Sequence, residues 1–396
     1  MPDENHERSM RRALGLAREG IALASPNPYV GAVIVSPAGE ILGEAFHTYA
    51  GIKHAEVIAA EQAGERARGA TLYLNLEPCS HAGRTAACSD AVIRAGINRV
   101  YAAMSDPNPL VAGKGFERLR AAGIEVHIGL LECEARKLNE AFAKYILTKA
   151  PLVTLKAGMT LDGKIAPPYT SPADGVALAD AAGGWITSPD ARTHVQELRH
   201  AADAILVGVN TVITDNPLLT DRTGLPRRRP LLRVVSDSKL RLPLESRLVK
   251  TANKDVIVFC SFAEEKRRRE FAERGIRVEQ VRLGALDGRP DIAAIIERLG
   301  ELEITNLIIE GGALVNWTAL AANVVDKVFL FYAPKILAGT GSVPFASGPG
   351  FPHISEAARV RSISLHRFGE DFAVEGYIKD PYATDEREIR QIRPPS

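Results

Sequence analysis

Hydrophobic and polar positions recur along this chain with two different periods, and short runs of each kind follow one another. Apolar runs of about four to eight residues predict strands, and apolar residues three or four positions apart predict helices. In residues 1–150 the predicted strands are Val30–Val35, Ile41–Phe46, Thr71–Leu76, Arg99–Met104 and Glu125–Ile128. The predicted helices are Ser9–Ala22, His54–Ala63, Ala86–Ala95, Gly115–Ala122 and Glu132–Leu147. Strands that alternate with helices predict an α/β protein.

Pro151 closes this first series, because proline does not continue a helix. A second α/β series follows, with its clearest strands at Leu152–Ala157, Ala204–Val209, Leu231–Val235, Val256–Phe259, Leu307–Ile309 and Val328–Tyr332. The length of 396 residues exceeds the roughly 250–300 at which a single core stops growing. We therefore predict two different domains, 1–150 and 151–380, and a charged, disordered tail over 381–396.

Composition narrows the class of protein. Lysine and arginine number 49 against 48 acidic residues, so the net charge is +1, without the basic excess typical of nucleic-acid-binding proteins. The start is polar, and no apolar run reaches the roughly 18 residues that a membrane helix needs. Four cysteines are too few for a disulfide scaffold. We expect a cytoplasmic homo-oligomeric enzyme with a small-molecule substrate and no nucleic-acid or membrane partner.

The first half contains residues suited to a catalytic zinc ion. His54-Ala55-Glu56 opens one predicted helix, while Pro78-Cys79 follows a strand, and Cys88 lies nine positions later (88 − 79). Catalytic zinc uses three such protein ligands and keeps a fourth position for water, whose pKa it lowers. Glu56, two residues after His54, is placed to carry protons. This pattern is the signature of zinc nucleobase deaminases, although the second cysteine usually follows after three positions.

Other interpretations of these residues remain open at this stage. Cys79 and Cys88 are also compatible with inert buried thiols or with a structural zinc site completed by His81. A nucleic-acid deaminase predicts a basic, aromatic cleft, which the +1 charge and 6% aromatic content do not support. A zinc-stabilised binding protein would unfold on chelation, whereas a deaminase would keep its fold. A chain with only one active half is a further alternative.

Several motifs together resemble the bifunctional deaminase–reductases of riboflavin biosynthesis. They are Ser25–Val35 (SPNPYVGAVIV), Ala50–Val57 (AGIKHAEV), Leu76–Thr85 (LEPCSHAGRT), Asp106–Pro109 (DPNP), Lys156, Leu161–Lys164 (LDGK), Trp185–Thr187 (WIT), Gly208–Pro217 and Glu310–Gly312 (EGG). The resemblance extends from about Ser9 to Pro334, and the long cysteine spacing is normal in this family.

The resemblance implies a cytidine-deaminase-like three-layer α/β/α domain followed by a dihydrofolate-reductase-like α/β domain. The first would deaminate 2,5-diamino-6-ribosylamino-4(3H)-pyrimidinone 5′-phosphate, and the second would use NADPH to reduce the ribosyl group to ribityl. The expected zinc ligands are His54, Cys79 and Cys88, with Glu56, Lys156 and Asp215 as catalytic groups. The substrate is expected at Asn27, His47, His81, Gly183, Arg199, Leu219, Arg222 and Glu310. NADPH is expected at Gly158, Trp185, Thr211, Asp215, Gly312, Ala313, Leu314, Val315, Asn316, Trp317 and Thr318.

On their own, the residues of the second half indicate less. The predicted strand Leu307–Ile309 runs into Gly311-Gly312 and a helix from Ala313, which fits either a phosphate cradle or an ordinary turn. No G-x-G-x-x-G follows a strand, which argues against a Rossmann domain. Without the resemblance, Lys156 is better explained as a strand-end surface residue and Asp215 as a turn former before Asn216-Pro217.

Three features depart from the family pattern. Asn216 replaces a common second aspartate, the segment Pro167–Gly184 is long and rich in alanine, and Ala86-Ala87 replaces a proline pair before Cys88. None of these changes removes a predicted zinc ligand.

Overall fold

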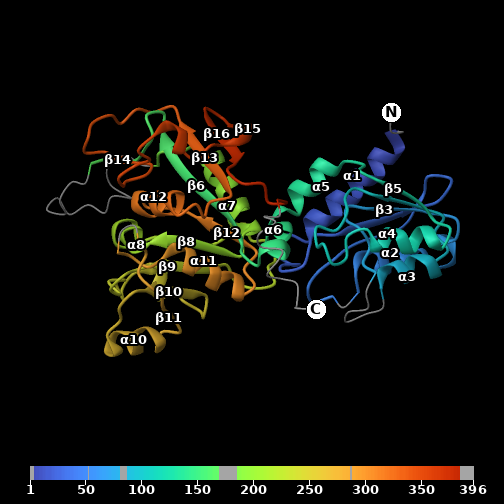
Figure 1. Cartoon of the computed structure of the whole chain (residues 1–396), viewed down its shortest axis with the longest axis horizontal. Helices are drawn as coiled ribbons and strands as arrows, with labels where there is room; N and C mark the ends of the chain where they lie inside the picture. Colours follow the sequence, from blue (N-terminus) through green and yellow to red (C-terminus); the bar gives the residue numbers. More distant parts are fainter. Residues whose placement is uncertain (1–3, 52, 81–86, 169–184, 286–287, 384–396) are drawn as a thin grey trace. The chain divides into compact units, whose positions relative to one another are not determined.

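The computed structural model describes residues 4–51, 53–80, 87–168, 185–285 and 288–383. These residues form two compact units (Figure 1). Unit 1 contains the described residues up to Lys149 together with Pro226–Arg229, and unit 2 contains those of Ala150–Leu225 and Pro230–Ala383. Both units are α/β. Within the described ranges, no helix combines the length and apolar character needed to cross a membrane.

Unit 1 is built on one five-stranded sheet in the order β2-β1-β3-β4-β5. The strands are β1 (Gly31–Val35), β2 (Ile41–Phe46), β3 (Thr71–Leu74), β4 (Arg99–Ala102) and β5 (Glu125–Ile128). Strand β1 pairs antiparallel with β2 and β3, whereas β3, β4 and β5 are parallel. The helices are α1 (Glu4–Glu19), α2 (Ala55–Ala63), η1 (Gly64–Ala67), α3 (Cys88–Arg94), α4 (Lys114–Ala121), α5 (Glu132–Leu138) and α6 (Glu140–Thr148).

Two glycines let helices lie directly on the two faces of this sheet. A Cβ atom on Gly31 would lie 2.1 Å from the carbonyl oxygen of Ala13 in α1, and one on Gly43 would lie 2.2 Å from that of Ala59 in α2. Gly43 pairs with Ile34, which is three residues from Gly31 and therefore faces the opposite side of the sheet. Helices on both faces confirm the predicted three-layer α/β/α arrangement.

The predicted single helix Glu132–Leu147 is wrong, because the chain forms α5 and α6 with a break at Asn139. This residue is fully buried and has φ −104° and ψ 15°, outside the helical region. Its side-chain oxygen accepts a hydrogen bond from the Tyr29 N–H at 2.8 Å, and its side-chain nitrogen donates to the Tyr29 carbonyl at 3.1 Å. A long-range contact thus overrides the helical periodicity.

We expect Asn139→Ala to destabilise unit 1 by about 1–3 kcal/mol, because it removes both buried hydrogen bonds to Tyr29. Urea unfolding should show a lower midpoint. Asn98→Ala is the matched control, since Asn98 is exposed in the same unit and its replacement should leave the midpoint within error. Equal midpoints for the two variants would contradict this account of the helix break.

Unit 2 contains a nine-stranded sheet in the order β11-β10-β9-β8-β12-β6-β13-β16-β15. The strands of the unit are β6 (Leu152–Thr160), β7 (Lys164–Ala166), β8 (Ala204–Gly208), β9 (Leu232–Ser236), β10 (Val256–Cys260), β11 (Arg277–Gln280), β12 (Asn306–Ile309), β13 (Lys327–Ala333), β14 (Val343–Pro344), β15 (Arg361–Phe368) and β16 (Asp371–Tyr377). The helices are α7 (Pro189–Ala201), α8 (Val209–Asp215), α9 (Arg247–Lys250), α10 (Glu265–Ala272), α11 (Ile292–Glu301), α12 (Ala313–Ala321) and η3 (Ile354–Glu356). Strands β7 and β14 form a separate pair.

The sheet is parallel from β11 to β13 and antiparallel from β13 to β15. Apart from the outer strand β11, the parallel strands are largely buried. Two apolar clusters pack around them, one including Val207 and Phe271 and the other Leu206 and Phe259. The predicted strand Ala204–Val209 runs one residue too far, because Val209 begins α8. The carboxyl ends of β6, β8 and β12 meet at one sheet edge, where α/β proteins commonly bind ligands.

Candidate active sites

Three possible metal-ligating side chains converge in unit 1. His54 immediately precedes α2, Cys79 lies in the loop after β3, and Cys88 begins α3. His54 Nδ1 lies 3.0 Å from Cys88 Sγ and 3.7 Å from Cys79 Sγ, and their ligand atoms all lie within 4.8 Å of one another. Tetrahedral zinc with bonds of about 2.0 Å to nitrogen and 2.3 Å to sulfur separates such atoms by roughly 3.5–3.8 Å. The donor set therefore fits zinc.

Contacts between the two thiols and His54 shift the pKa values of all three groups. The pKa of Cys79 is lowered to about 4, chiefly by its hydrogen bond with Cys88 and also by its hydrogen bond with His54. The same contact, together with burial, raises the pKa of Cys88, and the hydrogen bond with Cys79 raises that of His54. The cluster thus stabilises a thiolate, which is the form of cysteine that binds metals.

Glu56 lies next to this cluster in the first turn of α2. It is 3% exposed, and its side chain interacts with Cys88. Burial raises the pKa of its carboxyl, and its Oε2 atom has no hydrogen-bond partner among the described residues. A buried carboxylate oxygen without a partner is costly unless a ligand engages it. Glu56 is therefore available to an incoming water or substrate.

Two further predicted pocket residues lie beside the cluster. The ring of His47 is 4.9 Å from that of His54, and Asn27 Nδ2 is 3.0 Å from His47 Nε2. Burial and the neighbouring His54 lower the pKa of His47 to about 4, so its ring is neutral near pH 7. His81 was also predicted here, but it lies outside the described residues.

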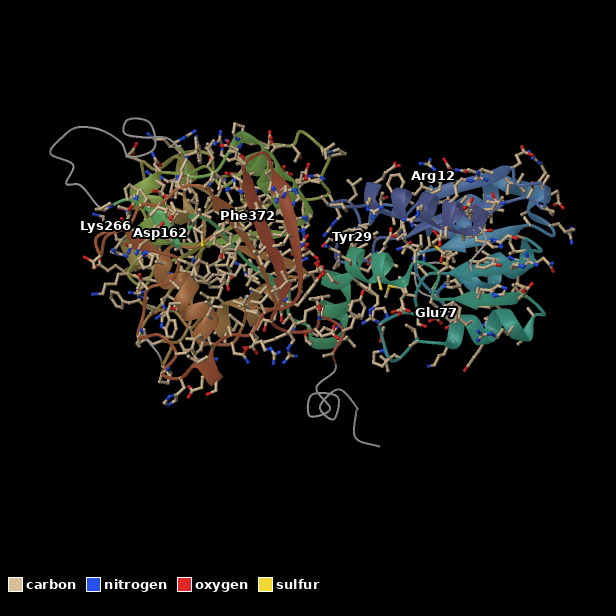
Figure 2. The ribbon with its side chains drawn as sticks, turned by 90° about the horizontal axis from the view of Figure 1, so that it is seen from above. Arg12, Tyr29, Glu77, Asp162, Lys266 and Phe372 are labelled. Atoms are coloured by element: carbon tan, nitrogen blue, oxygen red, sulfur yellow. The ribbon has the colours of Figure 1, made fainter. Side chains whose placement is uncertain are left out.

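Two buried residues that the sequence did not identify as functional support this site, Asn75 and Glu77; Glu77 is labelled in Figure 2. Asn75 accepts from the Gly31 N–H and donates to the Tyr29 carbonyl, which holds the segment that carries Asn27. Glu77 accepts backbone N–H bonds from Asp106, Gly113 and Gly115. The DPNP motif is thereby fixed to the residue two positions before Cys79. The only sequence signal for Glu77 was its place in LEPC.

A second cluster lies at the carboxyl edge of the sheet in unit 2. Arg199 of α7 forms two parallel hydrogen bonds with Glu310, from Nε to Oε1 at 2.7 Å and from Nη2 to Oε2 at 2.8 Å. Lys156 of β6 places its Nζ 3.6 Å from Glu310 Oε2. The side chains of these three residues are 8–15% exposed. The structure thus brings together three predicted site residues that lie far apart in the sequence.

Charge pairing determines the ionisation of this cluster. Burial alone would raise the pKa of Glu310, but Lys156 and Arg199 together lower it to about 2. Burial lowers the pKa of Lys156, while Glu310 acts in the opposite direction. Since the three groups carry one negative and two positive charges, the cluster favours an anionic or electron-rich ligand.

The predicted cofactor residues Gly312 and Thr211 lie together beyond Glu310. Gly311 and Gly312 adopt φ values of 83° and 73°, and a Cβ atom on Gly312 would lie 3.0 Å from Thr211 Oγ1. The Gly311 carbonyl accepts a hydrogen bond from the Gly208 N–H. Helix α12 begins at Ala313, so its first N–H groups form, with Gly311 and Gly312, a backbone cradle that suits a phosphate. These donors fit a phosphate group of NADPH.

The remaining predicted residues of unit 2 differ in how they could contact a ligand. Asp215 ends α8, one turn after Thr211, and desolvation raises its pKa. Asn316 donates to the Phe345 carbonyl, and Trp317 packs against Phe351. The side-chain nitrogen of Asn316 and the ring of Trp317 are therefore engaged within the unit.

Leu219 and Trp185 lie in opposite environments. Leu219 is 4% exposed and packs in the core, so only its main chain could contact a substrate. Trp185 is 62% exposed, with the Arg192 guanidinium 4.8 Å from its ring. Arg222 is exposed. Gly158 lies close to Thr187, because a Cβ atom on Gly158 would lie 3.2 Å from Thr187 Cγ2. Gly183, and the predicted loop from residue 169 onward, lie outside the described residues.

Comparisons with known proteins cover both units. Residues 3–104 match the cytidine and deoxycytidylate deaminase zinc-binding region, and residues 151–374 match the RibD C-terminal domain. The riboflavin biosynthesis protein RibD of Actinobacillus pleuropneumoniae is 40% identical over 372 residues, which cover 94% of this chain and 95% of that protein. The chain belongs to the RibD family. The Escherichia coli RibD is 38% identical, with coverage of 94% and 98%.

Solved RibD structures agree with this assignment. Acinetobacter baumannii RibD (form 1) has a TM-score of 0.78 at 33% identity and covers 94% of this chain and 99% of its own. A diaminohydroxyphosphoribosylaminopyrimidine deaminase/5-amino-6-(5-phosphoribosylamino)uracil reductase from Thermotoga maritima has a TM-score of 0.77 at 36% identity, with the same coverage. The fold of this RibD-family chain is therefore a cytidine-deaminase-like domain followed by a dihydrofolate-reductase-like domain.

Proposed function

We propose that this RibD-family chain catalyses two consecutive steps of riboflavin biosynthesis. Unit 1 deaminates the pyrimidine of 2,5-diamino-6-ribosylamino-4(3H)-pyrimidinone 5′-phosphate. Unit 2 then reduces the ribosyl group to ribityl with NADPH, which gives 5-amino-6-(5-phospho-D-ribitylamino)uracil. The observation that carries the proposal is the convergence of His54, Cys79 and Cys88 beside the buried carboxyl of Glu56.

In the deaminase, His54, Cys79 and Cys88 hold zinc, which when bound supplies the Lewis acidity that makes water nucleophilic near neutral pH. Glu56 takes a proton from the attacking water and delivers it to the departing amino group. Its raised pKa supports this role, because a carboxyl that both accepts and donates protons works best near the operating pH. Asn27 and His47 orient the pyrimidine. A purely structural zinc site would have no use for the unpartnered Oε2 of Glu56.

In the reductase, NADPH when bound supplies the hydride. Lys156 provides the ammonium that polarises the sugar carbonyl or imine and protonates it as hydride arrives. Glu310 and Arg199 hold Lys156 and the sugar, while Arg222 binds the phosphate, for which a guanidinium is well suited. Asp215 lies one helical turn after Thr211. We assign it to contact with the cofactor and to catalysis. The cradle at Gly312 receives the cofactor phosphate.

The direct test incubates purified protein with the diaminopyrimidine ribotide, with and without NADPH. We expect ammonia release under both conditions and NADPH oxidation only after deamination. Ammonia release without NADPH oxidation would leave the deaminase alone as the function. Absence of both, in protein that contains zinc, would overturn the proposal.

A pH profile tests the proposed role of Lys156. Glu310 raises the pKa of Lys156 against the effect of burial, so Glu310→Gln removes the charge that favours the ammonium. The amine then loses its proton at a lower pH. We expect the alkaline limb of reductase kcat/KM to move to lower pH in Glu310→Gln, while the deaminase profile stays unchanged. A limb that does not move, or moves to higher pH, would argue against Lys156 as the proton donor.

We also propose that the enzyme works in the cytoplasm as a homo-oligomer on a small-molecule substrate. The paucity of cysteines supports the cytoplasmic location, and the nearly balanced charge supports a small-molecule rather than a nucleic-acid ligand. Light scattering on the purified protein measures its assembly state directly.

A further inference from the structure

A short segment of unit 2, Leu218–Thr223, connects α8 to β9 and has an unusual backbone. Leu219 adopts φ 55°, in the left-handed region, which costs an ordinary L-residue roughly 1–2 kcal/mol. Such a conformation persists only when surrounding contacts over-determine it. The same segment contains Arg222, which the proposed function places at the substrate phosphate. What holds this segment therefore also holds the substrate-binding arginine.

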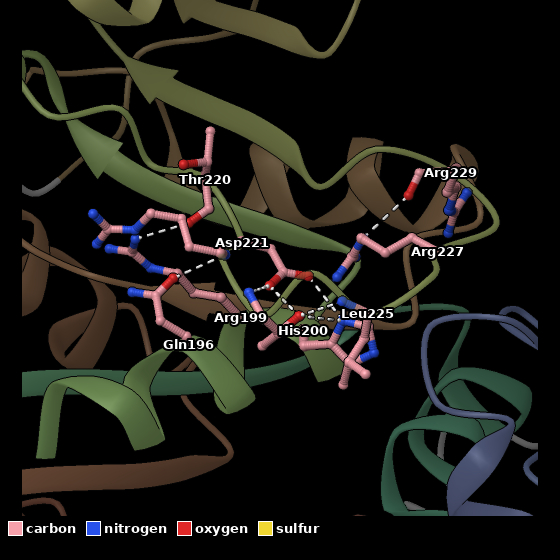
Figure 3. Close-up of polar contacts among 10 residues, drawn as sticks. Gln196, Arg199, His200, Thr220, Asp221, Leu225, Arg227 and Arg229 are labelled. Carbon is pink, nitrogen blue, oxygen red and sulfur yellow. Dashed lines mark hydrogen bonds and ion pairs between the residues drawn. The ribbon is translucent and has the colours of Figure 1, made fainter. Parts of the chain in front are cut away.

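Helix α7 presents three side chains to this segment (Figure 3). Gln196 Oε1 accepts a hydrogen bond from the Arg222 N–H at 3.1 Å, and Arg199 Nη1 donates to the Thr220 carbonyl at 3.1 Å. His200 Nδ1 lies 2.8 Å from Asp221 Oδ2. These helical residues, at positions i, i+3 and i+4, share one face of α7. Consecutive residues of the segment are thus bound to one rigid helix.

The contact between His200 and Asp221 is the most enclosed of these. The two side chains are 9% and 6% exposed. The other oxygen of Asp221 accepts from the N–H of Thr223 at 2.9 Å and from its hydroxyl at 2.8 Å. A buried carboxylate with both oxygens engaged has one orientation, because every alternative breaks a charge-assisted hydrogen bond. Asp221 immediately precedes Arg222, so holding Asp221 in one orientation also fixes the position of the Arg222 main chain.

The same helix face is connected to the reaction centre. Arg199, which donates to Thr220, also forms the two hydrogen bonds with Glu310, whose Oε2 lies 3.6 Å from Lys156 Nζ. One turn of α7 therefore sets the distance between Lys156 and the segment that carries Arg222. A substrate held at its phosphate and its reacting carbon needs this distance to be fixed.

We infer that His200 is a positioning residue of the reductase: its contact with Asp221 fixes Arg222 for the substrate phosphate. This inference rests on the proposed function. It assigns to His200 no contact with substrate or cofactor. Loss of the contact therefore weakens binding of phosphorylated substrate more than it slows the reaction of bound substrate.

The test uses three variants of the full chain with saturating NADPH. His200→Leu removes the ring nitrogen at similar volume, and His200→Asn keeps an amide nitrogen near the position of Nδ1. His366→Leu is the matched control, because His366 Nε2 makes an equivalent 2.8 Å contact with the buried Glu375 between β15 and β16. Reductase kinetics are measured with the deaminated ribotide and with its dephosphorylated form.

We expect His200→Leu to raise KM for the phosphorylated substrate about tenfold or more and to change kcat by less than about threefold. KM for the dephosphorylated substrate should not change, and His200→Asn should recover most of the loss. His366→Leu should leave both KM values unchanged.

An equal rise for both substrates, or the same rise in His366→Leu, would show that His200 only stabilises the fold. An unchanged KM in His200→Leu would overturn the positioning role while leaving the proposed function intact. Wild-type protein that oxidises NADPH with neither substrate would overturn the proposed function itself, and this inference with it.

Discussion

Glu56→Gln should abolish deamination while the protein keeps its zinc. The amide is nearly the same size as the carboxyl, but it cannot move a proton between water and the leaving amine. We expect kcat for ammonia release to fall by about 10³-fold or more, at the upper end of what a positioned acid–base group contributes. Because Glu56 is not among the proposed ligands, metal analysis should still find one zinc per chain. NADPH oxidation with deaminated substrate should stay at the wild-type rate, since Lys156 lies in the other unit.

Glu61→Gln provides the control for this variant. Glu61 lies on the same helix, α2, but is exposed and forms an ion pair with the exposed Lys53. Its replacement should leave both activities unchanged, because exposed ion pairs contribute little. Full ammonia release by Glu56→Gln would remove the proton-transfer role. Loss of zinc from that variant would instead indicate that Glu56 is needed to organise the metal site.

Lys156→Met should have the second large effect, on the reductase alone. The variant removes the ammonium next to Glu310 but keeps an unbranched side chain of similar length. We expect NADPH oxidation to fall by about 10²-fold or more, while ammonia release stays at the wild-type level. Glu310 keeps its two hydrogen bonds with Arg199, so the buried carboxylate is not left without a partner.

Lys327→Met separates chemistry from stability in this comparison. Lys327 is also a buried lysine paired with a buried glutamate, since its Nζ lies 2.8 Å from Glu375 Oε1, and β13 is next to β6 in the same sheet. It should lower stability to a similar extent and leave NADPH oxidation near the wild-type rate. Similar losses of reductase activity in the two variants would assign the Lys156 effect to folding.

The local patterns of the chain predicted the α/β class of the fold and most strands of unit 1, whereas its three-layer arrangement was predicted from the family resemblance. Short apolar runs marked β1 and the parallel core strands, because a strand buried on both faces is apolar throughout. The long helix at 132–147 was predicted wrongly, since the amide of Asn139 reaches Tyr29, which is distant in sequence. Strands β15 and β16 were not predicted, and β15 is largely exposed, so it lacks the continuous apolar run of a buried strand.

The metal cluster could be predicted because its residues are rare, and their spacing reflects one strand–loop–helix unit. The cluster in unit 2 could be placed only by resemblance. Lys156, Arg199 and Glu310 are common surface residue types, and only the packing of β6, α7 and β12 brings them together. His200 had no signal at all, because nothing in one sequence distinguishes a histidine that orients a loop from one that faces solvent.

The order of strands in the larger sheet has a consequence for synthesis on the ribosome. Strand β6 opens unit 2, yet its two neighbours in the sheet, β12 and β13, are translated near the end of the chain. The backbone N–H and C=O groups along its two edges therefore stay unpaired until most of the polypeptide has emerged, whereas the sheet of unit 1 is complete by residue 128. If the chain folds as it is synthesised, unit 1 can fold and bind zinc early, whereas unit 2 completes its sheet late. Nascent chains therefore need chaperone protection mainly for the reductase.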